Sequence, residues 1–270
     1  MAVAKKTPSA LKALGKAELP AQIEVCGRTY HREHVYKNDF FAATALYAGD
    51  AGKVVLKVQR QAPFLLIPLS WVGRILARRE EAILKHLEGL HGIPLFLERW
   101  GPTGLAREYI DGCSLSSAQP VPDDFHPRLA SLIDALHRNG MAYVDLEKRD
   151  NVLVGVDRLP YLIDFQISWY LPRRWGGELW PARVIRRWLQ AGDRYHLLKL
   201  WRRTRPDQLT PEQRAASYCK PWFVRVYSRA TRPLTLGRRW VLDRVDPRPK
   251  QGERGRVNEP TVMGVAKQCH

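Results

Sequence analysis

The sequence lacks any long apolar run. Its most apolar stretch, Phe64 to Gly73, has about half of the roughly 20 apolar residues that a membrane-spanning helix needs, and it contains Pro68. The first 20 residues have no apolar core of the kind found in secretory signals, so we expect a cytoplasmic protein. Cysteine is also scarce and has neither a CxxC pair nor the spacing of metal ligands, which indicates idle thiols in a reducing compartment, at Cys26, Cys113, Cys219 and Cys269.

Acidic residues are scarce in the second part of the chain. Residues 1–168 carry 21 basic and 19 acidic side chains, whereas residues 169–270 carry 23 basic and 8 acidic ones. Seven of the nine tryptophans also lie after residue 168. Positive charge interleaved with aromatic residues predicts an anionic partner, either an anionic acceptor or a membrane surface. RNA bound through arginine and stacked aromatics is a less favoured alternative, and a solvated basic face over a Trp-rich core is a third.

Hydrophobic spacing divides the chain into a strand-rich part and a helix-rich part. The runs at 43–49 and 53–58 are rich in β-prone residues around a turn at 49–52, which predicts a hairpin. Residues 71–90 and 123–140 have apolar residues at helical spacing. Further short strands are expected at 94–100, 104–110, 141–146, 151–156 and 160–165. After Trp169 the pattern is helical, basic and interrupted by proline.

The expected architecture is α+β with two lobes. A β-rich N-lobe with one long helix occupies residues 21–110, and a helical C-lobe occupies residues 111–245. The flanking segments 1–20 and 246–270 are expected to form flexible tails. The sequence does not decide the oligomeric state.

Two carboxylates and one carboxamide are the strongest candidates for chemistry. Asp145 and Asp164 each follow a short apolar run, and the residues between them can pair as a hairpin. Asn151 lies on the same loop as Asp145. Each aspartate alone is more typical of a turn cap, but three oxygen ligands in one cleft suit Mg²⁺, which also accepts waters and phosphate oxygens.

Residues 136–154, LHRNGMAYVDLEKRDNVLV, and residues 162–168, LIDFQIS, resemble the catalytic loop and the DFG region of protein kinase-like enzymes. The resemblance implies that Asp145 accepts or orients the proton of an attacking hydroxyl. It implies that Asn151 and Asp164 hold Mg²⁺ against the phosphates of ATP. Lys148, with its neighbour Arg149, would reach the γ-phosphate.

The other expected parts of such an enzyme follow in the same order along the chain. Lys57 in VVLKV resembles the strand lysine that contacts the α- and β-phosphates. Glu80 resembles the helix glutamate that pairs with this lysine, and Glu81 is the alternative. The segment REYIDG resembles the hinge, which implies that backbone groups of Glu108 and Ile110 bind adenine.

Several positions depart from the protein kinase pattern. Tyr143 and Val144 replace the usual His-Arg, and Asn151 follows Asp145 by six residues instead of five, so Asp150 is an alternative metal ligand. The usual DFG glycine is Gln166, and residues 36–47, where a glycine-rich loop is expected, contain no glycine.

Two further positions bear on the same resemblance. Arg107 falls at the gatekeeper position of the base pocket. Asp193 either anchors the catalytic loop or caps a helix. The departures resemble the atypical bacterial branch, which includes lipopolysaccharide core (Kdo/heptose) kinases, aminoglycoside phosphotransferase relatives and RIO-type kinases.

The sequence therefore predicts an ATP- and Mg²⁺-dependent phosphotransferase. Its acceptor would be a hydroxyl group, either on a lipopolysaccharide-type sugar or on a protein serine or threonine. A peripheral position at the inner face of the membrane is compatible with the basic, Trp-rich part. The alternative is a pseudokinase-like basic scaffold that binds a membrane or nucleic acid without catalysis.

Overall fold

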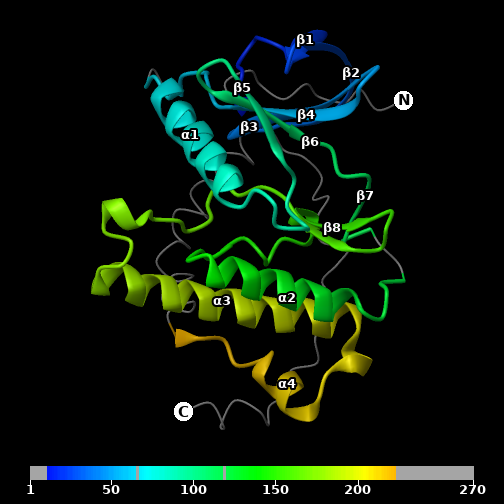
Figure 1. The fold of residues 1–270 in the computed structure, drawn as a ribbon, viewed down its shortest axis with the longest axis vertical. Coiled ribbons are helices and arrows are strands. Elements are labelled where there is room, and N and C mark those ends of the chain that lie inside the picture. Colours follow the sequence, from blue (N-terminus) through cyan, green and yellow to red (C-terminus); the bar gives the residue numbers. More distant parts are fainter. Residues whose placement is uncertain (1–10, 65–66, 118–119, 223–270) are drawn as a thin grey trace. The chain divides into compact units, whose positions relative to one another are not determined.

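The computed structural model describes residues 11–64, 67–117 and 120–222 (Figure 1). The chain divides into a first unit, Ser9–Asp193, and a second unit of which residues 194–222 are described. Among the described residues, no helix combines the length and the apolarity needed to cross a membrane.

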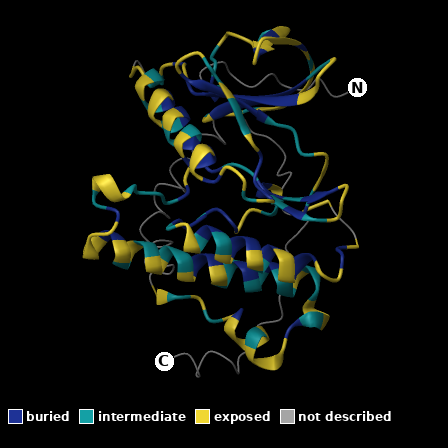
Figure 2. Ribbon diagram, viewed as in Figure 1, coloured by how far each residue is buried: buried dark blue, intermediate teal, exposed yellow. Residues whose placement is uncertain are grey.

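The first unit begins with a six-stranded sheet in which every neighbouring pair is antiparallel. The strand order is β1-β2-β3-β4-β6-β5. The central strands are almost wholly buried (Figure 2). Gly49 pairs with Gly52 across the turn that the sequence predicts. The strands are β1 (Gln22–Val25), β2 (Arg28–Asn38), β3 (Ala42–Gly49), β4 (Gly52–Gln59), β5 (Phe96–Trp100) and β6 (Gly104–Glu108).

Helix α1 (Ser70–His86) packs against β4, β5 and β6 of this sheet (Figure 1). Its buried residues recur at helical spacing and are Gly73, Ala77, Glu80, Ile83 and Leu84. Gly73 allows a close approach, because a Cβ there would lie 2.2 Å from the carbonyl oxygen of Arg60. The helix ends four residues before the predicted limit of 90, and Gly89 follows with a left-handed φ of 84°.

A smaller antiparallel sheet follows, in the order β7-β8-β9. Its strands are β7 (Gly112–Ser114), β8 (Val152–Gly155) and β9 (Pro160–Leu162). Helix α2 (Phe125–Arg138) contacts β9 and buries Leu129, Leu132, Ile133 and Leu136.

The strand predicted at 141–146 is wrong. That segment forms only an isolated bridge between Ala142 and Trp169. The backbone N–H groups of Tyr143 and Val144 donate to the carboxylate of Asp193 instead of to a strand partner. Val144 also has a φ of 71°, which strand geometry does not allow.

The chain continues into helix α3 (Trp180–Thr204), which confirms the helical character expected after Trp169. In the second unit, α4 (Pro211–Ala216) is opened by a capping box between Thr210 and Gln213. Short 3₁₀ turns occur at η2 (Arg149–Asn151), η3 (Arg173–Trp175) and η4 (Pro206–Gln208).

Part of the segment expected to be an N-terminal tail is held against the first sheet. The N–H of Ala13 donates to the carbonyl of Asp39 at 2.7 Å, and its carbonyl accepts from Gln61 at 2.8 Å. The expected C-terminal tail lies outside the described residues. The expectation of four idle thiols is also corrected: Cys26 and Cys113 are free and exposed, whereas Cys219 is disulfide-bonded.

Candidate active site

A cavity of about 400 Å³ in the first unit contains most of the predicted site residues. One wall comes from the six-stranded sheet and α1, and the other from β7, η2, β8 and the residues after β9. The walls include polar and apolar side chains: Tyr36, Lys37, Thr44, Val55, Lys57, Glu80, Arg107, Tyr109, Ile110, Gly112, Ser114, Asp150, Asn151, Leu153, Ile163 and Asp164.

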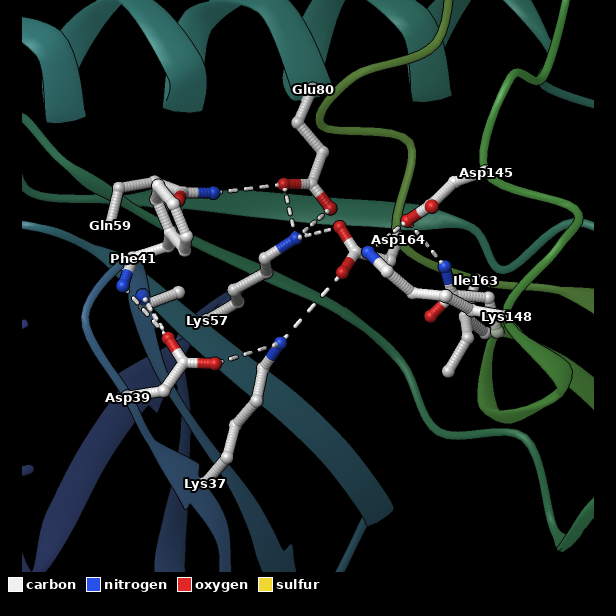
Figure 3. A network of polar contacts seen from close by, with 12 residues as sticks. Lys37, Asp39, Phe41, Lys57, Gln59, Glu80, Asp145, Lys148, Ile163 and Asp164 are labelled. Atoms are coloured by element: carbon white, nitrogen blue, oxygen red, sulfur yellow. Dashed lines mark hydrogen bonds and ion pairs between the residues drawn. The ribbon is translucent and has the colours of Figure 1, made fainter. Parts of the chain in front are cut away.

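Lys57 occupies the centre of a buried ion-pair network (Figure 3). Its Nζ lies 2.8 Å from Glu80 Oε2 and 2.7 Å from Asp164 Oδ1, and its side chain is only 4% exposed. Gln59, two residues further along β4 on the same face, donates to Glu80 at 3.0 Å. Burial alone would lower the pKa of Lys57, but Glu80 and Asp164 raise it above its ordinary value. The ammonium group is therefore kept charged.

Glu80 and Glu81 face different surroundings. Glu80 points inward to Lys57, whereas Glu81 pairs with Lys85 at 2.9 Å and Arg99 at 2.6 Å. Adjacent helix residues are separated by about 100°, so only one of the two can face the sheet. The structure places Glu80 there.

Asp164 connects the two walls of the cavity. It lies directly after the run that contains β9 and has a φ of 66°. Its Oδ1 contacts Lys57, and its Oδ2 lies 3.7 Å from Lys37 Nζ (Figure 3). Burial would raise the pKa of Asp164, but Lys57 and Lys37 hold it well below its usual range. The carboxylate is therefore ionised at neutral pH.

The loop from Asp145 to Asn151 forms a second polar group. Asp145 Oδ2 accepts from Lys148 Nζ at 2.6 Å and from Asn151 Nδ2 at 2.7 Å. Asp145 and Asn151 are both buried, and Lys148 is largely exposed. Asp150 accepts instead from the hydroxyls of Ser114 and Ser116. The extra loop residue thus leaves Asn151, not Asp150, in contact with Asp145.

Asp193 fixes the backbone of this loop. Its carboxylate is 1% exposed and accepts from the N–H groups of Tyr143 and Val144, each at 2.7 Å. His137 Nε2 lies 3.0 Å from the same carboxylate. Asp193 is in the interior of α3, so the helix-cap alternative is wrong. The bonds to Asp193 hold Val144 in its left-handed conformation.

Tyr143 joins the Asp145 loop to the Asp164 segment, a role that the sequence did not reveal. Its hydroxyl donates to the carbonyl of Ile163, and its ring packs edge-on against Phe165 at 5.3 Å between centroids. Burial, followed by the nearby Asp164 and Asp145, raises the pKa of Tyr143 well above its ordinary value. The phenol therefore stays protonated and can keep donating.

The residues predicted to bind a nucleotide base lie at the end of β6 and just beyond it. The N–H of Glu108 already donates to Leu95 at 2.9 Å, so this group is not free for a ligand. Ile110 lines the cavity, and within the described residues its backbone forms no hydrogen bond. Arg107 also lines the cavity and is buried.

The part of the chain that the structure describes holds no dense cluster of metal ligands, at this site or elsewhere. No group of three or more histidine, cysteine, aspartate or glutamate side chains comes together there. The predicted magnesium ligands Asp164 and Asn151 line the cavity, as do the carboxylates of Glu80 and Asp150, and Asp145 is bonded to Asn151.

The sequence matches no protein-family model, and no curated protein matches it. The fold, however, is similar to solved structures. The Rio2 kinase from Chaetomium thermophilum matches with a TM-score of 0.50 and 18% identity, over 69% of this chain and 63% of that one. The Rio2 kinase-ADP/Mg²⁺-phosphoaspartate complex from the same organism has a TM-score of 0.49 and 17% identity, over 69% and 61%.

The chain therefore spans less than two thirds of the Rio2 kinase that it matches. At this identity the likeness shows the fold alone. It confirms the expected α+β architecture, with a β-rich N-terminal sheet carrying a helix and a helical C-terminal part.

Proposed function

We propose that the protein is an ATP- and Mg²⁺-dependent phosphotransferase that transfers the γ-phosphoryl group to a hydroxyl acceptor. One observation carries the proposal. Across one cavity, the Lys57 ammonium lies between Glu80 on its own wall and Asp164 on the opposite wall, and that opposite wall also carries Asn151, which is bonded to Asp145. Charged groups fixed in advance stabilise transferring phosphoryl groups without reorganising during the reaction.

The donor atoms of the site fit Mg²⁺. Asp164 is held ionised by Lys57 and Lys37. Asn151 uses its Nδ2 on Asp145, and its Oδ1 accepts no hydrogen bond among the described residues. Mg²⁺ prefers such oxygen ligands and completes its shell with waters and phosphates. When bound, the ion would neutralise charge on the phosphate oxygens.

The chain's own residues divide the remaining work. Lys57 would bind the α- and β-phosphates, oriented by Glu80. Asp145 has Oδ2 occupied by Lys148 and Asn151, which leaves Oδ1 to accept the hydrogen of the attacking hydroxyl. Lys148 is exposed enough to turn from Asp145 toward the γ-phosphate. The base contacts would come from Arg107, Tyr109 and Ile110, which we call the base side.

The acceptor is best placed on the basic, aromatic segment that follows the site. Trp175, Trp180 and Trp188 are 69%, 76% and 42% exposed, and Arg173 and Arg174 directly precede Trp175. Exposed tryptophan beside arginine suits an anionic sugar acceptor or a membrane surface. The rest of the basic segment, from residue 223 onward, lies outside the described residues.

The first test measures nucleotide binding. A thermal-shift titration with ATP should give stabilisation that depends on Mg²⁺, because a ligand that binds only the native state raises its melting temperature. Asp164→Asn should remove the Mg²⁺ dependence. Asp50→Asn is the matched control, because Asp50 lies in the exposed β3–β4 turn, where asparagine is well tolerated. A purified protein that no Mg²⁺-nucleotide stabilises would instead favour the non-catalytic basic scaffold.

The second test measures transfer. With γ-labelled ATP and either lipopolysaccharide core sugars or protein substrates, one acceptor class should become labelled. Asp145→Asn should keep nucleotide binding but lower turnover by about 10²- to 10⁴-fold, the usual contribution of a general base. Full turnover by Asp145→Asn would rule out its assigned role.

A further inference from the structure

Arg107 is a buried cation that faces the cavity. It pairs with Val55 on β4, while Lys57 pairs with Leu105, so Arg107 and Lys57 point to the same side of the sheet. Arg107 is 8% exposed and lines the cavity together with Tyr36 and Tyr109. This side chain reaches the site from the strand that leads into the base side.

The guanidinium of Arg107 has few partners of its own. Arginine carries five N–H donors and no acceptor. Among the described residues, its only hydrogen bond runs from Nη1 to the carbonyl of Glu108, at a long 3.4 Å. Its Nε is buried without any partner. A buried charge of this kind is costly unless something supplies acceptors.

The two carboxylates whose charge acts on Arg107 do not fill this role. Glu80 and Asp164 act on Arg107 through their charge, yet both carboxylates make their close contacts to Lys57. The Glu108 carbonyl, the acceptor beside Arg107, already receives its Nη1. The Arg107 guanidinium therefore offers unused donors to a ligand at this position.

A purine base would meet these donors with either an amino group or an oxygen at position 6. The 6-amino group of adenine is a donor, so it would face the donors of Arg107 without forming a bond. Guanine offers O6 and N7, the pair of acceptors that arginine binds through two parallel hydrogen bonds. The apolar side chains of Val55, Leu153 and Ile163 in the same cavity suit the flat faces of either base.

We propose that Arg107 makes the cavity select a nucleotide with a 6-oxopurine base, such as guanine, over adenine. This inference rests on the proposed nucleotide-dependent function and changes its preferred phosphoryl donor from ATP to GTP. Arg107 would read the base, while Lys57 and Asp164 serve the phosphates of either nucleotide.

Equilibrium binding of GTP, ITP and ATP in Mg²⁺ to the full chain tests the inference directly. ITP has the 6-oxo group of GTP without its 2-amino group, so it isolates position 6. We expect GTP and ITP to bind similarly and both to bind roughly 5- to 100-fold more tightly than ATP, the range that one bidentate arginine contact provides. Equal affinity for the three nucleotides would overturn the inference and leave the phosphotransferase proposal intact.

A variant assigns the selectivity to the side chain. Arg107→Met, which keeps an unbranched apolar side chain but no donors, should bring the ratio of GTP affinity to ATP affinity to within about threefold. Arg128→Met removes one exposed arginine of α2 and should leave the ratio unchanged. If Arg107→Met weakens the binding of GTP and ATP equally, Arg107 contacts phosphate and the inference fails. If no nucleotide binds with Mg²⁺ to the wild-type chain, the proposed function itself fails.

Discussion

Lys57 and Arg107 line the same cavity, from neighbouring strands and on the same face, but they differ in their partners. Lys57 contacts two carboxylates at less than 3 Å, and Gln59 binds one of them in turn. Arg107 has one long hydrogen bond and a buried Nε without a partner.

Lys57 is a cation whose partners are already in place within the protein, whereas the hydrogen bonds of Arg107 would be completed by a ligand. A buried ion is stable when its own protein supplies hydrogen bonds, as for Lys57. A buried ion without them costs stability and is retained where another molecule completes its bonding, as we infer for Arg107. The two cations should therefore respond in opposite ways to substitution, and the following variants test that contrast.

The largest effect is expected where a bonded partner of Lys57 is lost. Glu80→Ala should lower the free energy of unfolding by about 3 kcal/mol, because it removes one partner of a buried ion pair. Chemical denaturation would measure the change. Glu81→Ala is the matched control, since its partners Lys85 and Arg99 are more exposed and the expected loss is at most about 1 kcal/mol. Equal losses for the two variants would show that the Lys57 network contributes no more to stability than the more exposed ion pairs of Glu81.

The next effect concerns the loop that carries Asp145. Asp193→Ala should destabilise the protein by about 2 kcal/mol, because the buried N–H groups of Tyr143 and Val144 lose their acceptor. Turnover should fall as well, while nucleotide affinity changes little. Asp193→Asn keeps one acceptor oxygen, so its stability should lie between those of the parent protein and of Asp193→Ala. A fully active Asp193→Ala variant would show that the loop holds its conformation without this anchor.

The sequence predicted best those residues whose place follows from local periodicity. Asp164 follows a short apolar run that can pair with its neighbour as a hairpin, so it could be expected in a cleft with Asp145, whereas Lys57 was expected there only from the resemblance to protein kinases. The choice of Glu80 over Glu81 was also within reach, because Ala77 and Ile83 place Glu80 on the buried face of the helix.

Contacts between distant segments could not be predicted in this way. Asp193 acts on Tyr143 and Val144 from 50 and 49 residues away, out of a helix that begins at Trp180. The same contacts replaced the strand expected at 141–146. In the sequence, Tyr143 only marks the absence of the histidine usual in protein kinases. The fold alone reveals that its hydroxyl donates to the carbonyl of Ile163.

The charge state of Asp164 should make the unfolding free energy depend on pH in acid. Because Lys57 and Lys37 depress its pKa in the folded state, Asp164 adds stability that is present above the ordinary carboxyl pKa of about 4 and is lost as the pH falls toward the folded value. Asp164→Asn should therefore flatten the dependence of the unfolding free energy on pH below about 4. Denaturation curves at several acidic pH values would measure this slope. An unchanged slope would mean that Asp164 is not held ionised by the lysines.

The smallest effect is expected at Arg107 in the absence of any nucleotide. Replacing a buried, poorly bonded charge by an apolar side chain of similar length is often neutral or stabilising. Arg107→Met should therefore keep the unfolding free energy within about 1 kcal/mol of the parent or raise it, in contrast to Glu80→Ala. With saturating GTP and Mg²⁺ the parent should become more stable than Arg107→Met, because the ligand binds the parent more tightly and so stabilises it more. A loss of several kcal/mol without nucleotide would mean that the protein itself bonds Arg107, and the contrast with Lys57 would no longer hold.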